Sequence, residues 1–400
     1  MVRVAATALA ALLFAAPVCA QPLSYPLTIA HGGLSGAGAD VLKGEIAQSD
    51  FILFGEDHGF ADSPVLLGAL AQDAKPAGFD HYVIEVGPLS TQRFVDALAH
   101  GGMAAFQKIV HRYPLAYPFL ANHEDAETAA MFAALDANGQ PRLWGIDQEF
   151  IGAPALLLED LVAAAPNAAA RKTAEALLAR EREAAAKADQ ANFFLFTETE
   201  AQFDALAAQF AGSAKGQAII AALRKSAHIY QLYNADKNYL SNVERSALLA
   251  QSFLDAYNAA GKPKTIFRMG AEHVGLGLTT NNTFDPGTLT SSLAAANGRK
   301  ALRILFLPMG GRYLHIAPAA GNPFKVDDYD DADVKDFFAS IGADAAALPK
   351  DSWSLIPLEP VREALETRGI NKLKPMTRFF LLGYDYVITT PDAKPATTLY

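Results

Sequence analysis

The feature that most constrains the fold of this chain is the alternation of short apolar runs with segments of helical spacing. The runs carry few charges and many β-branched or aromatic residues, which is typical of strands buried on both faces of a parallel sheet. They are Phe51–Phe54, Tyr82–Glu85, Arg142–Ile146, Thr265–Arg268, Leu302–Leu307 and Phe379–Thr389. The helical segments between them include Pro64–Ala74, Ser90–Leu98 and Ala126–Leu135. This order predicts an α/β fold, with a mostly parallel sheet flanked by helices.

The alternation is interrupted between the third and the fourth run. From about residue 154 to residue 260 the chain is rich in Ala, Leu, Glu, Lys and Arg, which are strong helix formers, and it has no strand-like run. Long amphipathic helices are predicted over Ala163–Arg182 and Ala214–Tyr257. We interpret this stretch as a helical insertion between the third and fourth strands. It can serve as a lid or wall over a site, or as a helical layer that only covers the sheet.

Length and charge narrow the class of protein. A chain of 400 residues fits one large domain or two ordinary ones, and 51% hydrophobic with 19% charged residues indicates a globular protein. The formal net charge is −10 and no basic cluster is present, which argues against nucleic acid and anionic membrane surfaces as partners. We expect a small-molecule substrate.

The first 20 residues have the pattern of a cleaved signal peptide. Arg3 precedes the apolar run from Val4 to Pro17, and Val18-Cys19-Ala20 has small residues at the cleavage positions. A transmembrane helix needs about 20 apolar residues, and this run is shorter. A lipid anchor on Cys19 is the other alternative, but Ala16-Pro17-Val18 matches the usual sequence before a lipidated cysteine poorly. We expect residues 21–400 to form one periplasmic or secreted domain without cysteine, and therefore without disulfides or a thiolate nucleophile.

Cleavage after Ala20 makes Gln21 the first residue of the mature protein. N-terminal sequencing of protein from the extracytoplasmic fraction should therefore begin at Gln21. An acylated Cys19 at the N-terminus would contradict the prediction.

Polar residues follow four of the predicted strands. The first strand runs into Glu56 and His58, the second ends at Glu85, the third is followed by Asp147, and the fourth runs into Arg268 and His273. Ligands of open parallel sheets bind beyond the carboxyl ends of the strands, so these residues should converge although they are far apart in sequence. We take Glu56, His58, Glu85, Arg268 and His273 as candidate catalytic residues and Asp147 as a candidate substrate-binding residue.

Glu85 and Arg268 lie within or directly after apolar runs, where an unpaired charge is costly. Arg268 is therefore expected to pair with Glu56 or Glu85. A plain structural ion pair explains these two residues equally well. Two histidines in the same cleft favour a functional site, because imidazole gains and loses a proton near neutral pH. The seven remaining histidines have ordinary surface or capping explanations.

Several standard sites are absent from the sequence. Gly33-Leu34-Ser35-Gly36 lacks the final glycine and the preceding strand of a nucleophile elbow. The chain has no His-Glu-x-x-His zinc motif and no phosphate-binding loop with Gly-Lys-Ser/Thr. The candidate catalytic groups that remain are carboxylates, imidazoles and, in one alternative, a metal ion.

The strand-end motifs resemble a known superfamily. Gly55-Glu56-Asp57-His58-Gly59 resembles the Gly-Glu-x(x)-His-Gly sequence of the erythromycin esterase family, and Glu85 and His273 match its later Glu and His. Arg245-Ser-Ala-Leu-Leu-Ala-Gln-Ser is similar to the family's Arg-Asp-x-x-Met-Ala-x-Asn helix, with serine in place of asparagine. The sequence from Tyr384 to Pro391 is similar to its C-terminal strand. The resemblance covers nearly the whole mature chain and adds Arg245 as a candidate substrate-binding residue.

At two places the sequence differs from the erythromycin esterase motifs and is similar to related families instead. The first loop is one residue shorter than the Gly-Glu-Ala-Thr-His of the macrolide esterases and resembles the Gly-Glu-x-His of haem-binding ChaN lipoproteins. Residues 55–58 and 270–273 also fit the Gly-x-x-His pair of Tiki/TraB metalloproteases.

These observations give one leading functional hypothesis and two alternatives. The leading one is a hydrolase of an ester or related carbonyl bond that needs no cofactor: His58 is the base that activates water, Glu56 and Glu85 orient it, and His273 and Arg268 stabilise the oxyanion or position the substrate. The first alternative is a divalent metal held by His58, His273 and Glu85 in a metal-dependent hydrolase or peptidase. The second is a haem-binding protein, for which Tyr230, Tyr233 and Tyr239 are candidate ligands.

Overall fold

The computed structural model describes residues 23–317, 321–367 and 369–400. The predicted signal peptide, residues 1–20, lies outside these residues.

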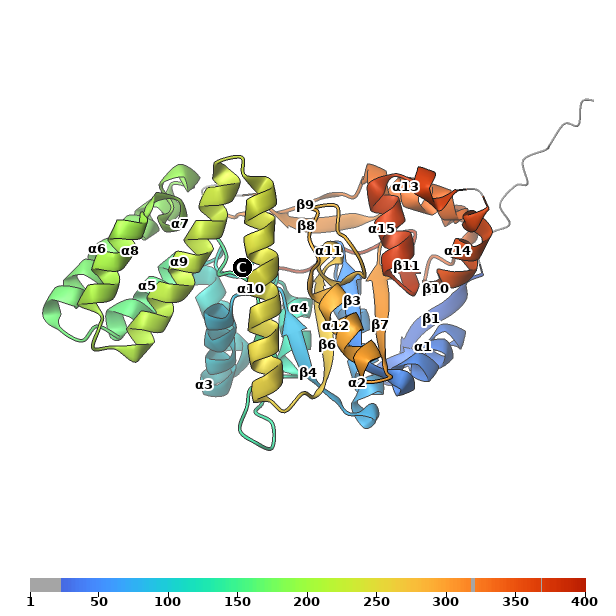
Figure 1. Ribbon diagram of the computed structural model, residues 1–400, viewed down its shortest axis with the longest axis horizontal. Helices are drawn as coiled ribbons and strands as arrows, with labels where there is room; N and C mark the ends of the chain where they lie inside the picture. Colours follow the sequence, from blue (N-terminus) through green and yellow to red (C-terminus); the bar gives the residue numbers. More distant parts are fainter. Residues whose placement is uncertain (1–22, 318–320, 368) are drawn as a thin grey trace, which may run out of the picture.

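A nine-stranded sheet forms the centre of the described chain, in the order β2-β1-β10-β11-β7-β3-β6-β4-β5 (Figure 1). All neighbouring strands from β11 to β5 are parallel, whereas β10, β1 and β2 pair antiparallel at one edge. The strands are β1 (Tyr25–Ala30), β2 (Gly33–Ser35), β3 (Ser49–Glu56), β4 (Phe79–Ile84), β5 (Leu143–Gly145), β6 (Lys264–Gly270), β7 (Lys300–Phe306), β10 (Trp353–Pro357) and β11 (Tyr386–Thr389). The predicted α/β class with a mostly parallel sheet is confirmed.

The sixth predicted strand, Phe379–Thr389, is wrong in its first half. Helix α15 (Pro375–Gly383) occupies this part, and only Tyr386–Thr389 is strand. A short apolar run does not distinguish a buried helix from a buried strand by its spacing. The signal that decides is Pro375, whose fixed φ suits the first turn of a helix.

Strands β1, β2 and β10 at the sheet edge were not predicted, nor was the hairpin of β8 (Arg312–Ile316) and β9 (Phe324–Asp328). These strands are short and lack the continuous apolar runs of the central strands. All of them except β10, whose three central residues are buried, are also half-exposed.

Alternating residues of β3 show how the sheet divides the core. Ile52 and Phe54 point into one apolar cluster, and Phe51 and Leu53 point into another on the opposite face. The helices around the sheet are α1 (Ala37–Gln48), α2 (Asp62–Ala74), α3 (Pro88–Arg112), α4 (His123–Ala130), α11 (Ala271–Val274), α12 (Pro286–Ala296), α13 (Ala332–Ile341), α14 (Glu359–Glu366) and α15. All four β3 side chains are at most 1% exposed, so this strand is covered on both faces.

Between β5 and β6 the chain is helical and forms a lobe at one side of the molecule (Figure 1). Its helices are α5 (Pro154–Ala163), α6 (Ala168–Ala186), α7 (Phe194–Thr197), α8 (Glu200–Gln209), α9 (Ala214–Asn234) and α10 (Asn238–Ala259). The lobe has an apolar cluster of its own. In the described part of the chain, no helix combines the length and the apolar composition that crossing a membrane requires.

Of the two long helices predicted in this stretch, Ala163–Arg182 corresponds to α6 but starts five residues too early, and Ala214–Tyr257 is interrupted. Residues 164–167 separate α5 from α6, and residues 235–237 separate α9 from α10. Asp236 has a φ of 57°, a left-handed conformation that ends a helix. Alanine-rich sequence favours helix on both sides of such a turn, so composition does not locate it.

Candidate active site

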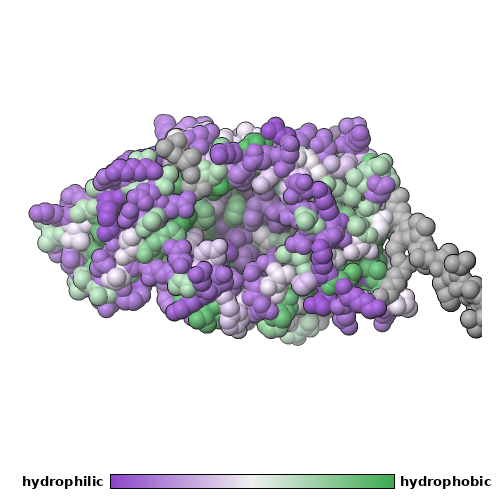
Figure 2. All heavy atoms as spheres, turned by 90° about the horizontal axis from the view of Figure 1, so that it is seen from above, coloured by the Kyte–Doolittle hydropathy of each residue, from purple (hydrophilic) through white to green (hydrophobic). Residues whose placement is uncertain are grey.

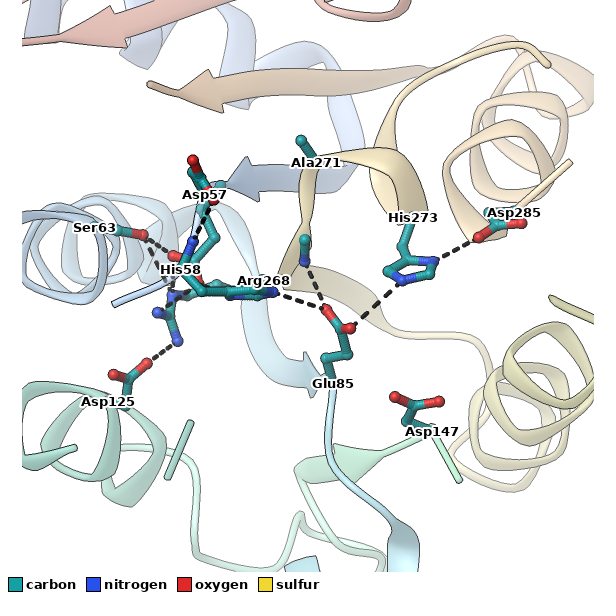
Figure 3. Close-up of polar contacts among 12 residues, drawn as sticks. Asp57, His58, Ser63, Glu85, Asp125, Asp147, Arg268, Ala271, His273 and Asp285 are labelled. Atoms are coloured by element: carbon teal, nitrogen blue, oxygen red, sulfur yellow. Dashed lines mark hydrogen bonds and ion pairs between the residues drawn. The ribbon is translucent and has the colours of Figure 1, made fainter. Parts of the chain in front are cut away.

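The carboxyl ends of β3, β6, β4 and β5 lie side by side because these strands are parallel neighbours in the sheet. Glu56 and Arg268 lie in the last residues of β3 and β6, and His58, Glu85 and His273 follow the ends of β3, β4 and β6. These five side chains form a connected polar network, of which Figure 3 labels His58, Glu85, Arg268 and His273. The side chains that the sequence places after separate strands are therefore neighbours in space.

Arg268 and Glu56 form the buried end of this network. The Nε and Nη2 atoms of Arg268 both lie 2.7 Å from the Glu56 carboxylate, and Nη1 pairs with Asp125. The Ser63 hydroxyl donates a further hydrogen bond to Glu56. Burial acts to raise the pKa of Glu56, but Arg268 and His58 outweigh it and hold the pKa below its usual value. Of the two partners expected for Arg268, Glu56 and Glu85, the structure pairs it with Glu56, and Asp125 is a second partner that was not expected.

His58 joins this ion pair to the centre of the site. Its Nδ1 lies 2.8 Å from Glu56 Oε1 and its Nε2 lies 3.6 Å from Glu85 Oε2. Its ring stacks on Phe119 with 3.9 Å between the ring centroids. Burial acts to lower the pKa of His58, but the two carboxylates outweigh it and raise the pKa to about 10.

His273, on α11, approaches the same carboxylate from the other side. Its Nδ1 lies 2.5 Å from Asp285 Oδ2, and its Nε2 lies 3.4 Å from Glu85 Oε1 (Figure 3). Burial and Arg245 act to lower the pKa of His273, but Glu85 and Asp285 outweigh them and raise it to about 9. A carboxylate at Nδ1 favours the ring form that carries a proton there, so Nε2 of each histidine is the atom that faces Glu85.

Glu85 is the common partner of both histidines. It also accepts hydrogen bonds from the Gly270 backbone N–H at 2.6 Å and from Arg245 at 2.6 Å. Burial acts to raise the pKa of Glu85, but His273, His58 and Arg245 outweigh it and hold the pKa well below its usual value. A Cβ on Gly270 would lie 3.1 Å from His58 Nε2 and 3.4 Å from Glu85 Oε2, so glycine keeps room for this contact.

Asp147 and Arg245 form an ion pair beside Glu85. Arg245, on α10, donates from Nε at 3.0 Å and from Nη2 at 2.5 Å to the two oxygens of Asp147. Its second contact, to Glu85, ties the insertion to the sheet.

A cavity of about 360 Å³ opens onto His58, Glu85, Asp147 and Arg245. Figure 2 views the molecule from above and shows a hollow between the helical lobe and the rest of the molecule. Helices α9 and α10 supply Ile229, Tyr230, Tyr233 and Asn242 to its lining, so the helical insertion forms a wall of the cavity. Arg268, Glu56 and His273 lie outside this lining.

The structure also places the side chains that the metal-binding and the haem-binding alternatives would use as ligands. Among the described residues, no group of three or more His, Cys, Asp or Glu side chains is arranged to hold a metal ion. Each Nε2 of the two histidines faces Glu85 itself. Tyr230 and Tyr233 line the cavity, whereas Tyr239 is 58% exposed on α10 and lies outside the lining.

Four residues of the network were not found from the sequence: Asp285, Asp125, Ser63 and Phe119. Asp285 precedes Pro286, and an aspartate followed by proline is a typical helix start, but nothing in the sequence links it to His273. Asp125 lies in the first turn of α4, just before the predicted helical segment Ala126–Leu135, and its pairing with Arg268 depends on the packing of α4. Phe119 carries no sequence signal.

The fold is the erythromycin esterase-like fold. A solved structure of a variant of the erythromycin esterase EreC, in its open conformation, aligns over 89% of this chain and 94% of its own, with a TM-score of 0.55 and 14% identity. A Bacillus cereus protein, structural genomics target BcR135, covers 90% of this chain and 92% of its own at a TM-score of 0.53 and 11% identity. A succinoglycan biosynthesis protein, target BcR136, covers 94% and 96% at a TM-score of 0.55 and 13% identity.

No family model and no curated protein matches the sequence. At these identities the similarity establishes the fold alone, and the fold that the predicted resemblance implies is confirmed.

Proposed function

We propose that this protein hydrolyses an ester or a related carbonyl bond of a small molecule. The observation that carries the proposal is the pair of carboxylate–histidine dyads, Glu56–His58 and Asp285–His273, that face the single carboxylate of Glu85 at the edge of a cavity. The likeness to an erythromycin esterase supports a hydrolase and says nothing about which ester is cleaved. We also propose, from the predicted signal peptide, that the protein is exported and is periplasmic or secreted.

The raised pKa of His58 favours catalytic roles for His58 and Glu85 that differ from those expected from the sequence. His58 has the higher value and lines the cavity, so at neutral pH it is a cation that can donate to the carbonyl oxygen. The base is then Glu85, which faces the cavity and passes the proton to His273 behind it.

The reaction balances within this network. The oxygen of a water molecule attacks the carbonyl carbon, and its proton moves through Glu85 to neutral His273. The bond from carbon to the leaving oxygen breaks, and His58 protonates that oxygen to give the alcohol. A proton then returns from His273 through Glu85 to His58, which restores the starting state. Arg268 contacts no reacting atom in this scheme and is a positioning residue that fixes Glu56.

The pH dependence of activity tests this scheme. His273 must be neutral, so kcat/KM should rise with pH, about tenfold per unit at neutral pH, and level off near pH 9. His58 must be protonated, so the rate should fall again above about pH 10. Both histidines share Glu85, so the two apparent pKa values belong to the cluster.

Hydrolysis of phenyl acetate, followed by chromatography of the products at pH 6 to 11, measures this profile. A blank with the His58→Gln variant corrects for spontaneous hydrolysis. A rate that is constant or falls between pH 6 and pH 9 would contradict the proposed roles. Metal analysis and an absorbance spectrum of the purified protein test the metal-dependent and haem-binding alternatives.

A further inference from the structure

Glu149 is a buried carboxylate that the proposed reaction does not use. It lies two residues after Asp147, in the segment between β5 and α5, and is 1% exposed. Its carboxylate accepts hydrogen bonds from the backbone N–H of Leu89 at 2.8 Å and of Ser90 at 3.3 Å, and from the Ser90 hydroxyl at 2.6 Å. These three bonds fix the side chain of Glu149 at the start of α3.

The start of α3 takes its cap from this distant segment. The N-cap residue is Gly87, which has no side chain that could accept from the N–H groups of the first turn. A carboxylate at this end of a helix also interacts favourably with the helix dipole. A Cβ on Gly87 would lie 2.3 Å from the Glu149 carboxyl group, so glycine is what allows the close approach.

The cap joins the two segments that carry Glu85 and Asp147. Glu85 directly follows β4, and the residues after it lead into α3. Between the two segments, the Asp147 backbone N–H donates to the Val86 carbonyl in a bond of 3.2 Å. The Glu149 carboxylate adds the next connection, with shorter bonds, and its backbone N–H donates to the Ser226 hydroxyl of α9 at 2.9 Å. The segment of Asp147 is thus held against both α3 and the helical insertion.

The contacts of Arg245 depend on the spacing of these two segments. Its Nη2 donates both to Glu85 at 2.6 Å and to Asp147 at 2.5 Å, so one nitrogen bridges the two carboxylates. Glu85 is the base of the proposed reaction, and Arg245 helps to hold its pKa low. Small shifts of groups that position a reacting residue can cost about a hundredfold in rate.

We propose that Glu149 is a positioning residue: its carboxylate fixes the segment of Asp147 against the start of α3 and thereby keeps Arg245 bonded to both Asp147 and Glu85. This inference rests on the proposed function, since Glu85 is the base there. A residue that only capped α3 would stabilise the helix without affecting Arg245.

Hydrogen exchange of the Arg245 Nε–H, followed by nitrogen-15 NMR, tests the position of Arg245 without a substrate. This N–H donates to Asp147 at 3.0 Å, and its signal is assigned by its loss in Arg245→Lys. Burial raises the pKa of Glu149 to about 7, although hydrogen bonds from Ser90 and Leu89 act to lower it. The measurement is therefore made at pH 8, where the carboxylate is ionised.

The variant Glu149→Gln should exchange the Arg245 Nε–H about tenfold faster than the wild type, because its amide has only one acceptor oxygen for the donors of α3. Its kcat for phenyl acetate should fall at least about tenfold, with a smaller change in KM. Ser90→Ala removes one donor to the same carboxylate and should act in the same direction to a smaller extent. It takes the place of Glu149→Gln if that variant does not fold.

The matched control is Glu181→Gln on α6. Glu181 is also 1% exposed and accepts a backbone N–H, that of Phe194 at 2.7 Å, and burial raises its pKa to about 7 as well. It lies outside the polar network of the site. This control should lose stability in denaturant unfolding, but it should keep the wild-type exchange rate at Arg245 and the wild-type kcat.

A wild-type exchange rate at Arg245 in Glu149→Gln would overturn the inference. Faster exchange of equal size in Glu181→Gln would do the same, since it would report a general loss of stability, and so would faster exchange with an unchanged kcat. If Arg245 is loosened as expected but the wild type hydrolyses no simple ester, the positioning by Glu149 stands and the proposed hydrolase function fails. If the wild type hydrolyses esters and Glu149→Gln keeps both values, the function stands and this inference fails.

Discussion

Replacing His58 by glutamine should lower kcat/KM for ester hydrolysis by at least about a hundredfold. Glutamine keeps a donor for Glu56 but carries no proton that it can transfer to the leaving oxygen. The matched control is His123→Gln on α4, where the imidazole is 43% exposed and pairs with Glu127. The control should retain full activity. Full activity of His58→Gln would remove His58 from the mechanism, and recovery of lost activity by added divalent metal would favour the metal-dependent alternative.

The substitution His58→Gln should also lower the stability of the fold, by an amount that depends on pH. The pKa of His58 is raised from 6.5 to about 10 in the folded protein, so the protonated ring stabilises the fold. This contribution is complete below about pH 6.5 and disappears as the pH rises through about 10. The difference in melting temperature between the wild type and His58→Gln should therefore be larger at pH 6 than at pH 10. Activity is to be compared at a temperature at which circular dichroism shows both proteins folded.

Replacing Arg268 by methionine should destabilise the protein by about 3–5 kcal/mol, because it leaves buried carboxylates without their cation. Glu56 and Asp125 are each 2% exposed, and both pair with Arg268. The control is Arg303→Met in β7, since among the described residues Arg303 pairs with one carboxylate, that of Asp385, whose side chain is 27% exposed. Denaturant unfolding should show a clearly smaller loss for the control.

The pH dependence of the Arg268→Met defect identifies its cause. Burial already raises the pKa of Asp125 to about 6, and loss of the cation should raise it further. The pKa of Glu56, which Arg268 helps to hold below its usual value, should rise as well. Carboxylates with raised pKa values bind protons that the unfolded chain does not bind, so the stability of the variant should fall as the pH rises. We expect a larger defect at pH 8 than at pH 5. A defect of equal size at both values would indicate lost packing, and an unchanged stability would show that the ion pairs contribute nothing.

The fold class could be predicted because its signal is local. A strand covered on both faces needs consecutive apolar residues, and β3 provides them from Phe51 to Phe54. Helix α15 shows the limit of this signal, since Phe379, Phe380 and Leu381 are buried in a helix as they would be in a strand. The short strands β1 and β10, which pair antiparallel beside the parallel strands, were missed because their pairing with the sheet, and not their sequence, makes them strands.

The sequence by itself determined which side chains meet at the edge of the sheet. Parallel strands end at the same edge, so residues that follow β3, β4 and β6 converge whatever the details of packing. Only the tertiary structure decided how they pair. Asp285 reaches His273 because of where α12 starts, and Asp125 reaches Arg268 because of where α4 packs. The raised pKa values of the two histidines follow from burial and from these distances, which depend on groups far apart in the chain and are therefore absent from any local pattern of residues.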